Sequence, residues 1–403
     1  MTIEIGRFDG DWTTLTELIN LAFGTPWSEA QLEAERRVWE SDRSLVAVDG
    51  KELAGHTGAF SLLMAVPGAQ LPVAGVTLVG VLPTHRRRGI LRDLMRQQLT
   101  ELYESDAEPV AALTASEPSI YGRFGYGLAS DHLDITIPRT SRSLRPVAGT
   151  DEVGIRYADT VGSLELCTTI HDAEAATRAA MFRHDARWRQ YVSGENVTSS
   201  TANASPLRCV LAERSAETTG YAHFRTRRSG KNTIDVIRVH ATDLASHVAL
   251  WTFLLDQDLM AQTTYERLPS DDPLLALLVD PRVAQPTIAD GLWARLVDVP
   301  RALAARTYEE EVDVVLGVRD DFCPWNAGAW RLAGGPAGAT CERTDEEPDV
   351  VLDVRELGTV FFGRPSLLRL AAAGLVEEQT HGALAPVSRA FGAVRLPWLD
   401  TGF

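Results

Sequence analysis

Residues 75–102 read GVTLVGVLPTHRRRGILRDLMRQQLTEL, and the rest of the chain is interpreted outward from this stretch. Gly75–Leu82 is apolar and β-branched, which predicts a buried strand that ends before Pro83. From Ile90 onward apolar side chains recur on one face of a helix, at Leu91, Leu94, Met95, Leu99 and Leu102. The stretch therefore predicts a strand, a tight turn and a helix.

The turn between these two elements is basic. His85, Arg86, Arg87 and Arg88 stand directly before Gly89. Cations at the start of a helix lie at the positive end of its dipole, where each is disfavoured by about 0.3–1 kcal/mol. A bound anion would offset this, and the free N–H groups of a first helical turn suit a pyrophosphate. The alternative is a solvated basic turn of an unrelated α/β protein.

Two motifs carry a resemblance to a known family. Arg86-Arg87-Arg88-Gly89-Ile90-Leu91 resembles the acetyl-coenzyme A loop of the GNAT N-acetyltransferases, Arg/Gln-x-x-Gly-x-Gly/Ala, and departs from it at Leu91. The blocks PTHRRRGILR and ASEPSIYGRFGYG, the second at residues 115–127, resemble the Eis-type (enhanced intracellular survival) acetyltransferases of actinobacteria. The resemblance implies a mixed α/β (α+β) fold in which tandem GNAT-like domains precede a sterol-carrier-protein-like C-terminal domain.

The order of elements in the first third agrees with a GNAT fold. We expect a strand at Thr2–Phe8, a helix at Thr13–Phe23 that ends at Gly24-Thr25-Pro26, and a second helix capped by Ser28. A hairpin turns at Asp49-Gly50, a strand through Ser61–Val66 follows, and Val110–Ala115 is a central strand. A short helix, capped by Ser119 or Ser116, should hold Tyr121 and end at Gly125.

Three domains are expected, at residues 1–138, 150–285 and 291–403, with the Ser-, Arg- and Pro-rich Arg139–Gly149 as a linker. The middle third predicts helices at Leu164–Ile170, Ala173–Trp188 and Leu244–Leu259, together with strands near 208–213, 220–225 and 233–240. The long helix is preceded by Asp243, an ordinary N-cap, so this second GNAT-like domain lacks a coenzyme loop.

The C-terminal third predicts its own strands and helices. Gly291–Leu303 resembles the start of the Eis C-terminal domain. Strands are expected at 312–318, 330–333 and 350–353, a loop at Gly334–Gly338, and helices around 354–360 and 366–373.

The resemblance assigns roles in acetyl transfer to individual residues. An amine that attacks a thioester forms an oxyanion, expels a thiolate and sheds a proton. A backbone N–H at Val81 would face the oxyanion, and the Val79 backbone would pair with the pantetheine arm. Tyr121, in Tyr121-Gly122-Arg123-Phe124-Gly125-Tyr126, would protonate the thiolate, with a buried tyrosine bonded to a carbonyl as the alternative. The expected coenzyme-binding set is Val79, Val81, Arg86, Arg87, Arg88, Gly89, Ile90 and Ser116.

The chain end is the second catalytic candidate. The family places the α-carboxylate of the last residue, here Phe403, in the active-site cleft of the first domain, where it would hold the cationic amine and receive its proton. A carboxyl pKa of about 3.3–3.7 makes it a weak base, so orientation of the substrate is the main expected role. Alternatively, Trp398 and Phe403 only anchor a terminal segment.

The net charge of the chain indicates which classes of molecule it would bind. A net charge of -16 and a pI near 5.1 disfavour nucleic acid and anionic membranes and favour a cationic substrate. No Cys-x-x-Cys pair is formed by the four cysteines, which are Cys167, Cys209, Cys323 and Cys341, so they are taken as structural. No metal motif or close cluster includes the histidines His171, His184, His223 and His240, so no metal is expected. Arg225–Arg228 is interpreted as a hairpin loop. No signal peptide is recognised at Met1, and a cytoplasmic protein is expected.

These observations predict an acetyl-coenzyme A-dependent N-acetyltransferase that acts by direct transfer. The family resemblance implies aminoglycoside-type polyamines as acceptors and a hexameric assembly. Acetylation of protein lysines or small polyamines is the alternative within enzymes. A non-catalytic ligand-binding scaffold is the alternative from a different class.

Overall fold

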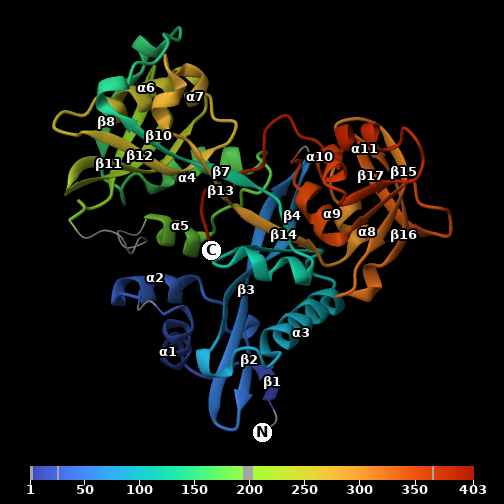
Figure 1. Ribbon diagram of the computed structural model, residues 1–403. Coiled ribbons are helices and arrows are strands. Elements are labelled where there is room, and N and C mark those ends of the chain that lie inside the picture. Colours follow the sequence, from blue (N-terminus) through green and yellow to red (C-terminus); the bar gives the residue numbers. More distant parts are fainter. Residues whose placement is uncertain (1–2, 25–26, 194–202, 365–366) are drawn as a thin grey trace. The chain divides into compact units, whose positions relative to one another are not determined.

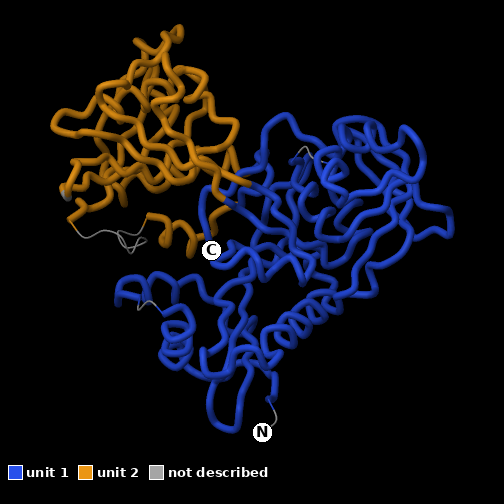
Figure 2. The backbone as a smooth tube through the Cα atoms, viewed as in Figure 1, with its two compact units in different colours: residues 1–130, 176–182, 290–403 blue, residues 131–175, 183–289 orange. Residues whose placement is uncertain are grey.

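The computed structural model describes residues 3–24, 27–193, 203–364 and 367–403 (Figure 1). The chain forms two compact units, which Figure 2 distinguishes by colour. Unit 1 contains residues 1–130, 176–182 and 290–403, and unit 2 contains residues 131–175 and 183–289. None of the described helices is long and apolar enough to cross a membrane.

The first sheet of unit 1 has the strand order β1-β2-β3-β4-β5-β14-β6. All neighbours in it are antiparallel except β4 and β5, which are parallel. Its strands are β1 (Ile3–Arg7), β2 (Leu45–Asp49), β3 (Glu52–Val66), β4 (Ala69–Val81), β5 (Val110–Thr114), β6 (Gly127–Leu128) and β14 (Leu292–Leu296). The sequence analysis grouped β14 with the C-terminal domain, yet it pairs with β5 along its whole length, from Leu292 opposite Thr114 to Leu296 opposite Val110.

Three helices accompany this sheet: α1 (Trp12–Phe23), α2 (Glu29–Val38) and α3 (Ile90–Ser105). The predicted cap at Ser28 is confirmed, because Ser28 accepts from the Gln31 N–H while the Gln31 side chain bonds back to the Ser28 N–H. Gly24 caps α1 with a φ of 71°, as predicted, whereas Thr25 and Pro26 lie outside the described residues. The hairpin turn is shifted by one residue: Asp49 still pairs with Glu52, so Gly50 and Lys51 form the turn.

A bulge interrupts the pairing of β4 with β3. Between His56 and Gly58 of β3, the register on β4 advances from Gly80 to Thr77 and skips Leu78 and Val79. Leu78 has a φ of 51°, and the ring Nδ1–H of buried His56 donates to its carbonyl over 2.8 Å. β4 pairs with β5 only from Val73 to Gly75. Beyond that point the two strands open, and the basic turn and α3 follow directly from the open end of β4.

Unit 2 is built on a second sheet with the order β13-β7-β12-β11-β10-β9-β8. Its helix α6 (Leu244–Leu255) contributes Leu250, Trp251 and Leu254, all with 0% exposure, to the core. Asp243 caps α6 by accepting from the Ser246 N–H, as predicted. The remaining elements are β7 (Asp131–Pro138), β8 (Gly154–Ala158), β9 (Arg208–Arg214), β10 (Glu217–Ser229), β11 (Lys231–Ala241), β12 (Gln262–Pro269), β13 (Thr287–Asp290), α4 (Leu164–Ala175), α5 (Ala186–Ser193) and α7 (Leu274–Leu277).

Several expectations for this part of the chain are wrong. The helix predicted at Ala173–Trp188 is interrupted, because residues 176–182 leave unit 2 and the Ala65 N–H donates to the Met181 carbonyl of that segment. The basic run Arg225–Arg228 is part of β10 and pairs with β11. The histidines were expected to lie apart from the cysteines, but His223 Nε2 lies 3.9 Å from Cys167 Sγ.

A third sheet completes unit 1, with the order β17-β16-β15-β18-β19. The expected loop at Gly334–Gly338 is the tight connection of a hairpin in which Gly335 pairs with Gly338. The elements are β15 (Val312–Arg319), β16 (Gly328–Gly335), β17 (Gly338–Thr344), β18 (Val350–Asp353), β19 (Val376–Glu378), α8 (Val299–Ala304), α9 (Val354–Phe361), α10 (Leu367–Ala372) and α11 (Leu384–Ala390). α9 packs closely on β14 and β6, since a Cβ at Gly358 would lie 2.3 Å from the Ala294 carbonyl oxygen.

Candidate functional site

A cavity of about 870 Å³ opens in unit 1 where β4 and β5 diverge. On the β4 side it is lined by Val79, Gly80 and Val81, and on the β5 side by Ser116 and the turn that follows. The start of α3 closes one end. The split in the sheet therefore places strand backbone, helix start and the residues after β5 around one space.

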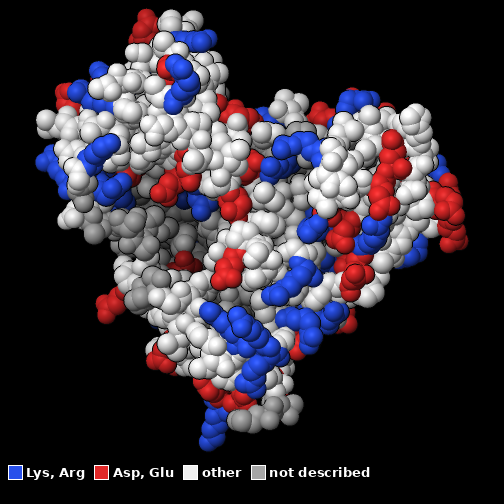
Figure 3. All heavy atoms as spheres, viewed as in Figure 1, with Lys and Arg blue, Asp and Glu red and all other residues white. Residues whose placement is uncertain are grey.

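The helix end of this cavity suits an anion. α3 begins after Gly89, whose φ is 85°, and no side chain caps its first N–H groups. The described residues that line the cavity include the cations Arg86, Arg87, Arg92, Arg96 and Arg123 but only the carboxylate Glu117. Figure 3 shows Lys and Arg side chains gathered on the surface around the region where Figure 1 labels β2 and α3. This local charge is opposite to the net charge of -16 of the whole chain.

The three arginines of the turn have different partners. Arg86 donates from Nη2 to the Ala22 carbonyl at the end of α1, over 2.7 Å, and therefore fixes the turn against that helix. Arg87 has a φ of 63° and lines the cavity. Arg88 donates to Asp49 Oδ2 over 3.0 Å and is not among the residues that line the cavity. Among these three, Arg87 has the side chain best placed to meet a bound anion.

Tyr121 lines the other end of the cavity. Its side chain is 6% exposed, and burial, with a smaller effect of Glu117, raises the pKa of Tyr121 to about 12. Its ring meets Tyr126 edge-on at 6.0 Å. Within the described residues the Tyr121 hydroxyl has no hydrogen-bond partner, which disfavours the alternative of a tyrosine bonded to a carbonyl. A protonated, unengaged phenol of this kind can donate a proton to an atom in the cavity.

The turn that carries Tyr121 is not the capped helix that the sequence predicts. It consists of two 3-10 turns, Pro118–Ile120 and Gly122–Phe124, and neither Ser116 nor Ser119 caps them. Gly125 ends the turn with a φ of 81°, as expected for a helix-ending glycine. The predicted glycine is therefore confirmed, whereas the cap is wrong.

A buried ion pair from a distant part of the chain holds this turn. Arg295 of β14 donates from Nη1 to the Phe124 carbonyl over 2.7 Å and from Nη2 to Asp320 Oδ2 over 2.5 Å. The side chains of Arg295 and Asp320 are 0% and 1% exposed. A Cβ at Gly125 would lie 1.6 Å from Arg295 Nη1, so only glycine leaves room for the guanidinium. Sequence reasoning missed this pair because its partners are far apart in the chain.

Phe403 lies on the same sheet, outside the lining of the cavity. Its main-chain oxygen accepts a hydrogen bond of 2.6 Å from Thr114 Oγ1, at the end of β5 and two residues before Ser116. Its ring meets Phe60 and Phe182 edge-on at 6.4 and 5.9 Å. Thr114 is a further residue that sequence reasoning missed, since an isolated threonine after an apolar strand carries no motif.

Of the residues singled out from the sequence, the structure gathers Val79, Val81, Arg86, Arg87, Gly89, Ile90, Ser116 and Tyr121 around one cavity. Arg88 and Phe403 lie beside it. Arg92, Arg96 and Phe322 line the cavity as well. The helical period of α3 places Arg92 and Arg96 on one face, four residues apart, which is the signal that could have identified them.

Known proteins and domain families match this chain along nearly its whole length. Models of the acetyltransferase (GNAT) domain match residues 8–129 and residues 179–296, and a model of the sterol carrier protein domain matches residues 299–400. An uncharacterized N-acetyltransferase of Streptomyces avermitilis is 43% identical over 98% of this chain and 97% of its own length. The N-acetyltransferase Eis of Mycobacterium bovis is 32% identical over 96% of this chain and 95% of its own.

A solved structure shows the same fold. The crystal structure of Eis1 from Mycobacterium abscessus covers 100% of both chains with a TM-score of 0.83 and 31% sequence identity. The expected architecture, tandem GNAT domains followed by a sterol-carrier-like domain, is thereby confirmed. This chain belongs to the Eis-type GNAT N-acetyltransferases.

Proposed function

We propose that this enzyme transfers the acetyl group of acetyl-coenzyme A directly to a primary amine of an aminoglycoside-type polyamine. The observation that carries the proposal is the cavity between β4 and β5, which has an uncapped, arginine-lined helix start at one end and the phenol of Tyr121 at the other. GNAT acetyltransferases use acetyl-coenzyme A, which has an anionic pyrophosphate and a reactive thioester at its two ends.

The geometry supports a division of roles along the cavity. The N–H groups that follow Gly89, with Arg87, would bind the pyrophosphate. The backbone of Val79, which the β3 register skips, would pair with the pantetheine arm, and the Val81 N–H would face the oxyanion. Tyr121 would give its proton to the departing thiolate, because its pKa of about 12 keeps it protonated at neutral pH.

The choice of a polyamine as the acceptor rests on the net charge of the chain. A polyamine is a multiple cation at neutral pH, and the chain carries a net charge of -16 that raises its local concentration. We assign to Phe403 the role of orienting the amine and taking its proton once attack has made the nitrogen acidic, because its main-chain oxygen is fixed by Thr114 beside the open end of β5. A hexameric assembly stays a prediction from the family resemblance, and a cytoplasmic location stays a prediction from the sequence.

The test measures free thiol released from acetyl-coenzyme A with a panel of acceptors: a multi-amino aminoglycoside, a linear polyamine and a lysine peptide. We expect turnover with the aminoglycoside, and the masses of the products give the number of acetyl groups added. Turnover confined to the polyamine or the peptide would replace the proposed acceptor. Absence of turnover with all three, together with no thermal stabilisation by acetyl-coenzyme A, would leave a ligand-binding scaffold.

A matched pair of variants tests the role of the phenol. Tyr121→Phe should lower kcat by about 100-fold, the low end for acid–base catalysis, with little change in the KM for acetyl-coenzyme A. Tyr126→Phe removes the neighbouring buried hydroxyl, which has no hydrogen-bond partner within the described residues, and should leave kcat unchanged. Equal losses in both variants would show that the ring pair serves packing only.

A further inference from the structure

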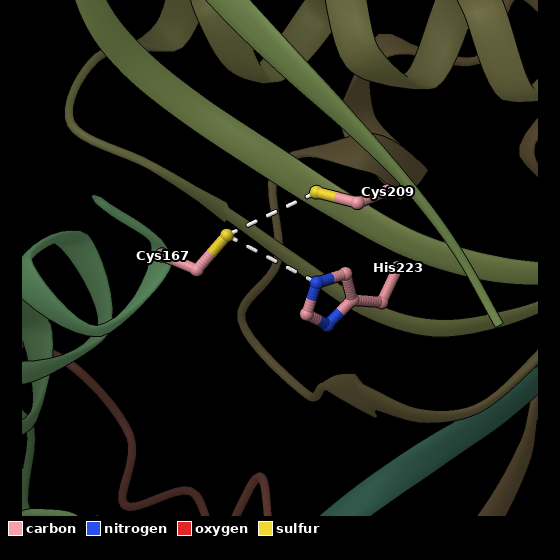
Figure 4. A group of neighbouring side chains, drawn as sticks. All are labelled: Cys167, Cys209 and His223. Carbon is pink, nitrogen blue, oxygen red and sulfur yellow. Dashed lines mark hydrogen bonds between the residues drawn. The ribbon is translucent and has the colours of Figure 1, made fainter. Parts of the chain in front are cut away.

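Three side chains with metal-ligating atoms meet inside unit 2, in a site that acetyl transfer does not use (Figure 4). Cys209 of β9 and His223 of β10 stand directly opposite each other in the strand register. Cys167 reaches them from α4. The three side chains are 1%, 3% and 3% exposed, for Cys209, His223 and Cys167 respectively.

The distances between the donor atoms leave room for a cation. Cys167 Sγ lies 3.9 Å from Cys209 Sγ and 3.9 Å from His223 Nε2, and all three ligand atoms lie within 4.8 Å of one another. Zinc binds thiolate at about 2.3 Å and imidazole at about 2.0–2.1 Å, which in a tetrahedral site places two sulfurs about 3.8 Å apart and sulfur and nitrogen about 3.5–3.6 Å apart. The two distances from Cys167 Sγ agree with these values within a few tenths of an ångström.

A disulfide does not fit the same geometry as well. The S–S bond length is about 2.05 Å, so the two sulfurs at 3.9 Å would have to approach by nearly half their separation. In the structure the two groups share a hydrogen bond instead.

Two further features favour zinc over other cations. Two thiolates and a neutral imidazole compensate a dication fully, which matters because an unbalanced buried charge is strongly unfavourable. A monovalent thiophilic cation would leave one net negative charge in the core. Ser163 Oγ lies 3.5 Å from Cys209 Sγ and donates its proton to the Asp159 carbonyl, so its lone pairs offer a neutral fourth ligand.

We propose that Cys167, Cys209 and His223 bind Zn²⁺ as a structural site, with Ser163 as the neighbouring oxygen donor. The ion links α4 to β9 and β10, which are themselves paired in the sheet at this point. The proposal is independent of the acetyl-transfer chemistry, because none of these residues lies in unit 1.

The first experiment uses the full-length wild-type protein. After removal of metal with a chelator, titration with ZnCl₂ should give one tightly bound Zn²⁺ per chain and raise Tm by roughly 5–10 °C at a hundredfold excess over Kd. Titration with Co²⁺ should produce thiolate-to-cobalt charge-transfer absorption and the visible bands of a four-coordinate ion. A protein that binds no stoichiometric Zn²⁺ and gives no thiolate–cobalt absorption would overturn the proposal.

Variants then assign the site. Cys167→Ser and Cys209→Ser should each weaken Zn²⁺ binding by at least about 100-fold, since loss of even an outer partner of a ligand costs 10–100-fold. Cys341→Ser is the matched control: it removes a buried thiol from β17 of unit 1 and should leave Zn²⁺ affinity within twofold. Equal affinity in all three variants would overturn the assignment. Recovery of only two alkylatable thiols from the unfolded, non-reduced protein would show a disulfide instead.

Discussion

We predict that the buried ion pair between Arg295 and Asp320 stabilises the turn that carries Tyr121. Asp320→Asn removes the negative charge but keeps the size of the side chain. Arg295, at 0% exposure, would then be a buried guanidinium without a counter-ion. Breaking a buried pair in this way costs about 3–5 kcal/mol.

The loss extends beyond the ion pair itself. Asp320 also accepts hydrogen bonds from the Cys323 N–H at 2.8 Å and from Asn326 Nδ2 at 3.1 Å, and an amide group cannot accept at both of its ends. At roughly 2–4 °C per kcal/mol for a large domain, Tm should fall by about 6–20 °C. Because Arg295 also bonds to the Phe124 carbonyl, kcat should fall at temperatures where the variant is folded.

A surface pair provides the matched control. Asp313 Oδ2 lies 2.8 Å from Arg331 Nη2, but the two side chains are 60% and 45% exposed, and Arg331 keeps a second partner in Glu346. Asp313→Asn should therefore leave Tm nearly unchanged. The assay is differential scanning calorimetry of both variants beside steady-state kinetics. If Asp320→Asn and Asp313→Asn shift Tm equally, the buried pair does not hold the turn.

Three further perturbations test the site. Arg87→Ala should weaken acetyl-coenzyme A binding by roughly 10–150-fold in calorimetric titration, because one charge-assisted hydrogen bond contributes about 1.5–3 kcal/mol. Arg88→Ala should leave this binding unchanged, and equal effects of the two substitutions would refute the assignment of the anion to Arg87. Burial lowers the pKa of His56 to about 4, so the unfolded chain binds a proton at this residue at a higher pH than the folded chain does. About 3 kcal/mol of stability that is present above pH 6.5 is therefore lost as the pH falls toward 4. The free energy of unfolding of His56→Gln should lack this dependence on pH, and an unchanged dependence would contradict the reasoning. Extension of the chain by a few residues beyond Phe403 should reduce kcat at least about 100-fold with the fold retained, and full activity would remove Phe403 from the chemistry.

Local signals made part of this structure predictable. The turn at Arg86–Gly89, the helix from Ile90 and the cap at Ser28 depend on residues within a few positions of each other, and all three are found where the sequence predicts them. The same holds for Asp243 before α6. In each case the residues that determine the element lie within a few positions of each other in the sequence.

Contacts between distant residues were not predictable. Nothing near Thr114 indicates that it pairs with Leu292, and the two cysteines and the histidine of unit 2 meet although 42 and 56 positions separate Cys167 from its partners. The apolar pattern of Ala173–Trp188 is helical, yet the Ala180 N–H donates to the Ala65 carbonyl and Ala180 adopts a φ of 72°. Tertiary pairing outweighs local propensity at these positions.

The place of β14 in the first sheet bears on how the protein is made. Arg295 follows Phe124 by 171 residues, so a ribosome that adds about 5–20 residues per second needs roughly 10–35 s between the turn and the strand that holds it. Throughout that interval the nascent chain carries β5 with an unpaired edge, and its residues Val110–Leu113 are fully apolar. The first sheet of unit 1 therefore cannot be completed when residues 1–130 emerge, and the apolar edge of β5 stays open to incorrect pairing until β14 has been synthesised.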